Sequence, residues 1–235
     1  MKRIRDFFAL ISRNIYETFL SLILTLNILP LLAPLLAKLG WYWPSKAIYT
    51  LYSFFCHQLH WRSIHVCDYQ YGWCSRCTFM WFNILLSGIA MKIFKMRKVK
   101  WYWIVVLIAP MALDGVIQTV ATMLGLASFT SITYMSSNFM RMLTGSMFGL
   151  GFGLFIFGNL QEIVLLEKGE KHKGKKLSLV WFVIASMLIS LLTYILMVFI
   201  WDKTSPSYKP LNFLDWGVRT PAQNEEFIDR GKDAL

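Results

Sequence analysis

The stretch YETFLSLILTLNILPLLAPLLAKL, residues 16–39, is almost continuously apolar and decides the class of fold. A helix needs about 20 apolar residues to cross the hydrocarbon core of a bilayer, so this stretch is long enough. It also exceeds the apolar core of a signal peptide, which is about 7 to 15 residues long, and it is followed by the aromatic run WYWP. We therefore expect a retained transmembrane helix. Asn27, Pro30 and Pro34 inside it predict a bent or interrupted helix.

Four further stretches have the length and apolar character of a membrane span: Cys77–Phe94, Tyr102–Leu126, Phe139–Leu166 and Leu177–Trp201. Hydrophobic residues make up 56% of the 235-residue chain and charged residues only 16%, whereas charged residues are about a quarter of a soluble domain. These features predict an all-α, multi-pass membrane protein. We expect about five transmembrane helices in one domain, residues 1–201, followed by a polar tail, residues 202–235.

The net charge of +11 is a signal of topology rather than of nucleic-acid binding, because the basic residues lie in short runs between apolar stretches. The runs MKRIR, KIFKMRKVK and EKGEKHKGKK all fall on the cytoplasmic side if there are five spans. This predicts an N-terminus inside and a C-terminus outside the cytoplasmic membrane. Residues 45–61 are shorter and more polar, and their spanning would put KMRKVK outside, so we expect an interfacial or re-entrant segment. The Cys/His-rich segment 45–77, the SFTSITYMSSN loop and the tail would then lie outside.

The outer segment CHQLHWRSIHVCDYQYGWCSRC, residues 56–77, holds all four cysteines and three of the four histidines. Cys74 and Cys77 have the C-x-x-C spacing that lets two thiolates bind one ion, and Cys56 and His57 would complete the tetrahedral set typical of zinc. Such a site is structural with four protein ligands. With three and an open position it could activate water or polarise a carbonyl group. Spare candidate ligands are His60, His65 and Cys67.

Two other interpretations of the cysteines remain open. Arg76 and the helix start next to Cys74 and Cys77 favour a reactive thiol, and Cys56 and Cys67 would form a second pair. That layout is similar to membrane disulfide-generating enzymes that use a quinone. Alternatively, structural disulfides fasten an outer loop of a non-catalytic subunit in a larger membrane complex. A c-type haem site is excluded, because residue 78 is threonine and not histidine.

Polar side chains inside the third and fourth spans mark a candidate functional site. If these spans are antiparallel neighbours, Asp114 and Arg141 lie close enough to pair, either to fix helix register or to serve as catalytic groups. In the catalytic case Asp114 would move protons and Arg141 would clamp an anion in an outward-facing cavity beside the cysteines. The substrate would be a membrane lipid or a small anion. Candidate substrate or anion-binding residues are Arg62, Arg76, Gln118, Asn138 and Thr144.

A smooth face is predicted on the fourth span, where Gly145, Gly149 and Gly153 recur every four residues. Small residues at this spacing let another helix approach closely. The partner helix would belong either to this chain or to another protein, and the polar tail is a second candidate surface for a protein partner.

Several separated motifs in the outer half carry a resemblance to a known family. In order they are FCHQ, WRS, CSRCT, PxxxDGxxQ and SNxxRxxTG, between Phe55 and Gly153. This pattern resembles the uncharacterised prokaryotic membrane-protein family called domain of unknown function 2085, and implies a membrane protein without implying an activity. The family pattern falls on Cys56, His57, Gln58, Arg62, Ser63, Cys74, Arg76, Cys77, Thr78, Asp114, Gly115, Gln118, Asn138, Arg141, Thr144 and Gly145.

The resemblance also separates shared residues from additions of this chain. His60, His65 and Cys67 lie outside the family pattern, so the shared set is three cysteines and one histidine, which suits a metal better than two redox pairs. Phe79 stands where family members usually have glycine. The function most consistent with the sequence is a metal-binding membrane protein that acts on a lipid or small anionic substrate.

Overall fold

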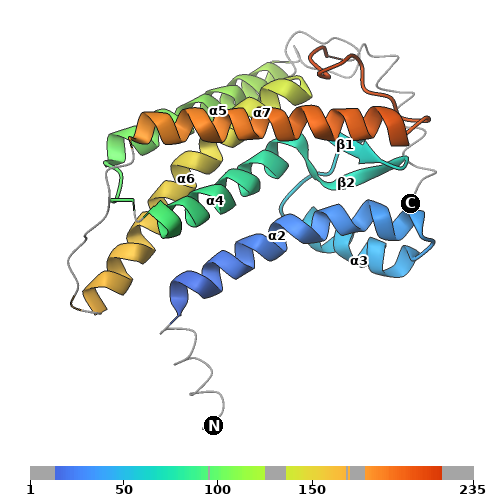
Figure 1. Cartoon of the computed structure of the whole chain (residues 1–235). Helices are drawn as coiled ribbons and strands as arrows, with labels where there is room; N and C mark the ends of the chain where they lie inside the picture. The colour runs from blue at the N-terminus through green and yellow to red at the C-terminus, as the bar shows by residue number, and fades with distance from the viewer. Residues whose placement is uncertain (1–13, 95, 125–135, 168, 170–177, 219–235) are drawn as a thin grey trace.

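The computed structural model describes residues 14–94, 96–124, 136–167, 169 and 178–218, in which long helices dominate (Figure 1). MKRIR, most of EKGEKHKGKK, most of SFTSITYMSSN and the tail from residue 219 lie outside the described residues. The described elements, in chain order, are α2 (Ile15–Lys38), α3 (Tyr42–Ser53), the 3-10 turn η1 (His60–Arg62), β1 (Ser63–Val66), β2 (Tyr69–Cys74), α4 (Ser75–Phe94), α5 (Trp101–Met123), α6 (Asn138–Glu167) and α7 (Leu179–Thr204).

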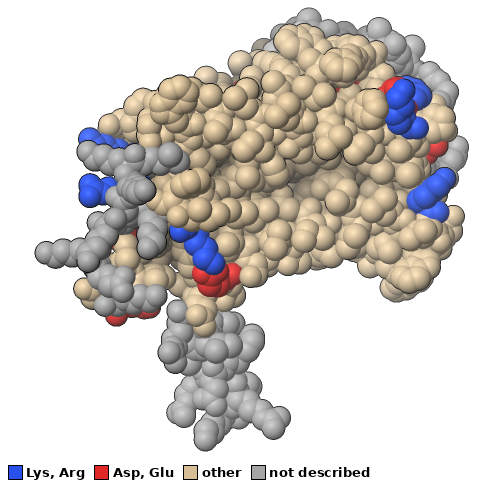
Figure 2. All heavy atoms as spheres, in the orientation of Figure 1, with Lys and Arg blue, Asp and Glu red and all other residues tan. Residues whose placement is uncertain are grey.

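The prediction of a five-span helical membrane protein is confirmed. Helices α2, α4, α5, α6 and α7 are each long and apolar enough to cross a bilayer. On the face shown in Figure 2, the charged side chains gather towards the two ends and leave an uncharged band between them, as a bilayer requires. Helix α3 has only 12 residues and does not qualify as a span, in agreement with the predicted interfacial helix.

One element was not predicted. Residues 63–74 form a two-stranded antiparallel hairpin, in which Ser63 pairs with Cys74 and Val66 with Tyr69. The hairpin lies at the end of the bundle where α4 begins, which we call the hairpin end (Figure 1). The bundle itself is all-α, but the Cys/His-rich segment includes a small sheet.

Helices α4 and α6 form the centre of the bundle and run in the same direction, away from the hairpin end (Figure 1). A Cβ atom added at Gly145 would collide with the carbonyl oxygen of Arg76, and one at Gly149 with that of Met80. At Gly153 the added atom would lie 2.7 Å from the Cβ of Ser87. The predicted glycine face therefore packs on α4 of the same chain, and this intramolecular contact covers it.

Helix α2 continues through Pro30 and Pro34, so of the two predicted alternatives, a bend or an interruption, the interruption does not occur. A proline has no N–H group, so Pro30 leaves the carbonyl of Leu26, four residues earlier, without its usual helical donor. The Tyr52 hydroxyl and the Trp73 indole donate to that oxygen over 3.3 and 3.2 Å. These bonds satisfy the freed acceptor, as is required away from water, and fasten α3 and the hairpin to α2.

The described part of the tail, residues 205–218, packs on the hairpin end through a few buried side chains, while others, such as Lys209 and Trp216, stay exposed. Tyr208 is buried, and its carbonyl oxygen accepts a hydrogen bond from the Trp201 indole. Asp215 is only 3% exposed and accepts bonds from the Asn138 side chain over 2.5 Å and from the backbone N–H of Leu211 over 2.9 Å. The tail thereby joins α7 to the first residue of α6.

Replacing Asp215 by asparagine is expected to lower the free energy of unfolding by about 1 to 3 kcal/mol, because the new amide presents an N–H group to one of two buried donors. Thermal unfolding in detergent measures the effect. The control is Asp202→Asn, which removes a carboxylate from more exposed pairs with Lys203 and Lys209 and should cost at most about 1 kcal/mol. Equal melting temperatures for the two variants would contradict the anchoring role of Asp215.

Candidate functional site

Three cysteines from three separate segments meet at the hairpin end. Cys56 follows α3, Cys74 is the last residue of β2, and Cys77 lies in the first turn of α4. Their sulfur atoms all lie within 4.8 Å of one another, and the Cys56 sulfur also accepts the backbone N–H of Cys74 over 3.3 Å. Tetrahedral zinc with bonds of about 2.3 Å to sulfur holds its sulfur ligands about 3.8 Å apart. The three sulfurs, which we call the cysteine cluster, are therefore close to a metal-binding arrangement.

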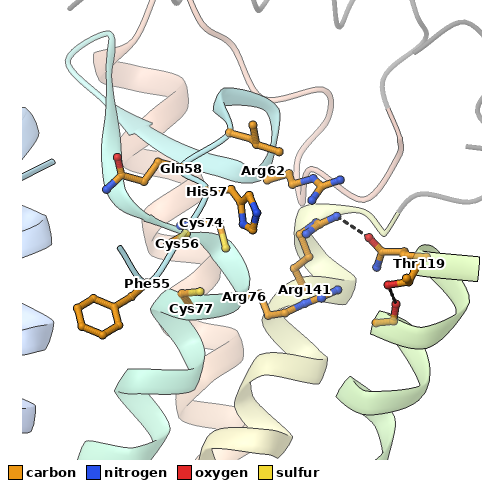
Figure 3. Close-up of a pocket in the computed structure, with 13 residues that line it drawn as sticks. Phe55, Cys56, His57, Gln58, Arg62, Cys74, Arg76, Cys77, Thr119 and Arg141 are labelled. Carbon is orange, nitrogen blue, oxygen red and sulfur yellow. Dashed lines mark hydrogen bonds between the residues drawn. The ribbon is translucent and has the colours of Figure 1, made fainter. Parts of the chain in front are cut away.

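The fourth predicted ligand, His57, lies beside the cluster without joining it. Its ring lines the same cavity as the three cysteines (Figure 3), but its nitrogen atoms are not within 4.8 Å of all three sulfurs. A metal ion on the cluster would have its fourth position open to this cavity, where His57 or water could occupy it.

The three spare candidates lie elsewhere. His60 and His65 contact each other, with 3.4 Å between the His60 Nδ1 and His65 Nε2 atoms, and both rings stack on Tyr208. Burial lowers the pKa of His60, which favours the neutral form of that ring. Cys67 is at the turn of the hairpin, where its backbone N–H donates to Thr204. The second redox pair, Cys56 with Cys67, is thus not assembled.

The thiols of Cys56 and Cys74 differ in their pKa values. Hydrogen bonding from the Cys56 thiol holds the pKa of Cys74 well below its usual range. Hydrogen bonding to Cys74 in turn raises the pKa of Cys56 to about 11. Cys74 is therefore the sulfur that ionises first, and a thiolate is the form that binds metal.

A cavity of about 340 Å³ adjoins the cluster and is lined by three arginines from three elements (Figure 3). They are Arg62 from η1, Arg76 from the first turn of α4 and Arg141 from the first turn of α6. In Figure 3 the sulfur atoms lie to one side of the view and the three arginine side chains extend to the other. We call this cavity the arginine pocket. Gly115, Gln118 and Thr119 of α5 complete its wall.

The prediction that Asp114 pairs with Arg141 is wrong. Asp114 pairs with Arg76 instead. Asp114 also accepts hydrogen bonds from Gln118 over 2.9 Å and from the hydroxyl of Ser136. Arg141 instead donates to the side-chain oxygen of Gln118 over 3.2 Å and to the backbone carbonyl of Ser136 over 3.0 Å. The parallel arrangement of α4 and α6 explains the exchange, since it brings Arg76 to the level of Asp114 as well.

Two of the predicted anion-binding residues do not line the arginine pocket. Asn138 accepts a bond from Ser75 and donates to Asp215 and to the Trp61 carbonyl, so it joins α4, α6 and the tail. The hydroxyl of Thr144 donates to the carbonyl of Met140, four residues earlier in the same helix. Both are buried parts of the support for the pocket.

Two residues that support the site, Gln58 and Ser136, were not predicted from the sequence. The Gln58 amide donates to the carbonyls of Tyr49 and Gly72, both over 3.0 Å, and so holds the loop that carries Cys56 and His57. The position of Gln58 beside these candidate ligands was a usable signal. No signal pointed to Ser136, one of several serines and threonines in its loop.

Fold and site together define a multi-pass helical membrane protein with a polar cavity and a cysteine cluster at one end of its bundle. The family model described as predicted membrane protein (DUF2085) matches residues 56–155, from Cys56 of the cluster to just past Gly153. The chain belongs to this family, as its motifs predicted.

The match to a curated relative agrees with this assignment. An uncharacterised protein of Methanocaldococcus jannaschii is 32% identical over 143 residues, which cover 57% of this chain and 84% of the relative. No solved structure matches the chain.

Proposed function

We propose that this chain is a membrane metalloprotein in which Cys56, Cys74 and Cys77 hold a zinc ion at the wall of the arginine pocket. The convergence of three sulfurs within 4.8 Å carries the proposal. Cys56 and Cys74 are 18 residues apart in the chain, so the fold and not mere proximity in sequence brings them together. Zinc suits three thiolates in tetrahedral geometry, with His57 or water as its fourth ligand.

Three sulfurs are better explained by a metal than by disulfides. A single disulfide within the cluster would leave one thiol over, and Cys67 lies apart in the hairpin turn. One metal ion uses all three sulfurs. This also disfavours the quinone-coupled mechanism, which was predicted to use two cysteine pairs.

The neighbouring pocket supports action on an anionic group of a lipid or small molecule. Arg141 and Arg62 would bind the anion, while the metal at the wall would polarise it or activate a water molecule. Asp114 was predicted as a proton carrier, but its pairing with Arg76 and two further hydrogen bonds suit a different role. We assign it to orienting Arg76 in the pocket.

The proposed location is the cytoplasmic membrane, with the hairpin end outside the cell. The basis is the distribution of basic runs, which all fall at the opposite end of a five-span chain. An oxidising exterior would favour disulfides in unprotected thiols, so a bound metal would also protect the cluster.

The decisive experiment is to purify the protein in mild detergent and to measure metal by elemental analysis together with free thiols. We expect about one zinc per chain. In the folded protein one thiol, Cys67, should react more readily than the other three, which become available after chelation and denaturation. No metal, with thiols that appear only after reduction, would overturn the proposal in favour of disulfide chemistry, and reoxidation by a quinone would then be tested.

A further inference from the structure

The arginine pocket holds more positive charge than its own residues neutralise. Arg76 is paired with the carboxylate of Asp114. Within the described residues no carboxylate lies within 4.0 Å of the guanidinium of Arg62 or of Arg141. Arg141 is 3% exposed, and in the part of the chain that the structure describes it donates only to neutral oxygens, those of Gln118 and Ser136. The buried Nε atom of Arg62 has no hydrogen-bond partner, and its guanidinium lies 6.0 Å from the ring of Trp61.

The surplus of positive charge in the arginine pocket would persist if the cysteine cluster held a metal ion. Three thiolates and one divalent ion carry a net charge of −1, which offsets one of the two unpaired guanidinium groups. One positive charge is left over, and Arg141, one of the two groups that could carry it, is only 3% exposed. Burying a charge without a partner is costly. A ligand that brings negative charge into the cavity would compensate the remaining positive charge.

We propose that the arginine pocket binds a phosphoryl group, held by Arg62, Arg76 and Arg141. The inference rests on the proposed function for the pocket, but it names the chemical class of the ligand. Each guanidinium group presents a planar fork of N–H donors, and the three come from η1, α4 and α6. A carboxylate has two oxygens in one plane, which one or two arginines satisfy. A phosphoryl group has up to three free oxygens arranged in a tetrahedron, which matches three forks from separate elements.

The size and surroundings of the pocket fit a phosphoryl group attached to a larger molecule. A cavity of about 340 Å³ lies at the lower end of the range of about 300 to 1,000 Å³ for small-molecule sites. Phe55 at its rim is 68% exposed, and the neighbouring Phe54 is 80% exposed. The phosphoryl group belongs either to a lipid headgroup or to a soluble molecule, and the experiment separates these sources.

The test is calorimetric titration of the metal-loaded protein in dodecyl maltoside with inorganic phosphate, and with acetate at equal ionic strength. A second arm adds short-chain phosphatidic acid to the micelles, with diacylglycerol as its uncharged counterpart. The variant is Arg62→Gln, which removes one of the two guanidinium groups that have no carboxylate partner within the described residues. The matched control is Arg97→Gln, which removes an exposed arginine between α4 and α5, at the opposite end of the bundle. Zinc is measured on every sample.

We expect phosphate or phosphatidic acid to bind more tightly than acetate, and Arg62→Gln to weaken that binding by about 10-fold to 100-fold while Arg97→Gln leaves it unchanged. Binding of phosphatidic acid alone assigns the site to a lipid, and binding of inorganic phosphate assigns it to a soluble phosphate. The proposal is overturned if neither phosphate binds better than acetate, or if both variants bind alike. Retained zinc in that case leaves the metal site standing, whereas absent zinc with intact phosphate binding would overturn only the proposed metal function.

Discussion

Replacing Cys74 by serine is expected to reduce bound zinc from about one ion per chain to nearly none. A serine hydroxyl is a poor zinc ligand, and Cys74 is the cluster sulfur that ionises first. Because structural zinc sites contribute an apparent binding free energy of about 10 to 16 kcal/mol, the loss should also lower the melting temperature strongly. Elemental analysis and thermal unfolding in detergent, with and without a chelator, measure both effects.

The control is Cys67→Ser, the same chemical change at the cysteine that lies in the hairpin turn outside the cluster. It should keep its zinc and nearly all of its stability. A chelator should bring the wild-type protein and Cys67→Ser down to the melting temperature of Cys74→Ser, since all three would then lack metal. If Cys74→Ser and Cys67→Ser retain equal zinc, the cysteine cluster is not the metal site.

Replacing Gly149 by alanine is expected to be at least as disruptive as losing a core side chain, although it adds only one methyl group. The new Cβ atom would clash with the carbonyl oxygen of Met80. This oxygen is a backbone atom, so it cannot move aside by a rotamer change as a side chain could. Helices α4 and α6 would have to separate along their whole contact. We expect a loss of about 3 kcal/mol or more, seen as a poor yield of monodisperse protein in size-exclusion chromatography and a lower melting temperature.

Gly158 on the same helix provides the comparison. An alanine Cβ there would meet side-chain atoms of Lys98 and Met91 at 3.5 and 3.6 Å, which is ordinary van der Waals contact. Alanine is a better helix former than glycine by about 1 kcal/mol, so Gly158→Ala should be neutral or stabilising. Similar behaviour of Gly149→Ala and Gly158→Ala would mean that α4 and α6 do not approach as closely as described.

The features predicted correctly from the sequence are those that depend on local pattern. Apolar length alone identified the five spans, because a bilayer imposes the same requirement on every crossing helix. The four-residue spacing of Gly145, Gly149 and Gly153 identified a close helix contact for a similar reason. The grouping of Cys56, Cys74 and Cys77 was predicted from the C-x-x-C spacing and from the family pattern, which leaves out Cys67.

The features that were missed depend on how elements turn towards one another. Whether Asp114 meets Arg76 or Arg141 is decided by the rotation and direction of α4 and α6, which no pattern within one helix reveals. The hairpin has strands of only four and six residues, too short for a clear alternation. Asp215 lies in a polar stretch of sequence that gives no sign of burial. It is buried because the fold places it against Asn138, which donates a hydrogen bond to it.

The glycine contact between α4 and α6 has a consequence for the dimensions of the site. Arg76 lies in the first turn of α4 and Arg141 in the first turn of α6, and at Gly145 and Gly149 the main chains of the two helices touch without an intervening side chain. The separation of the cysteine cluster from Arg141 is therefore set by main-chain thickness, a length that substitution of neighbouring side chains does not alter. If α4 and α6 are replaced by the helices of a family relative, both should be replaced together. Either helix alone would not fit the packing surface of the helix that remains.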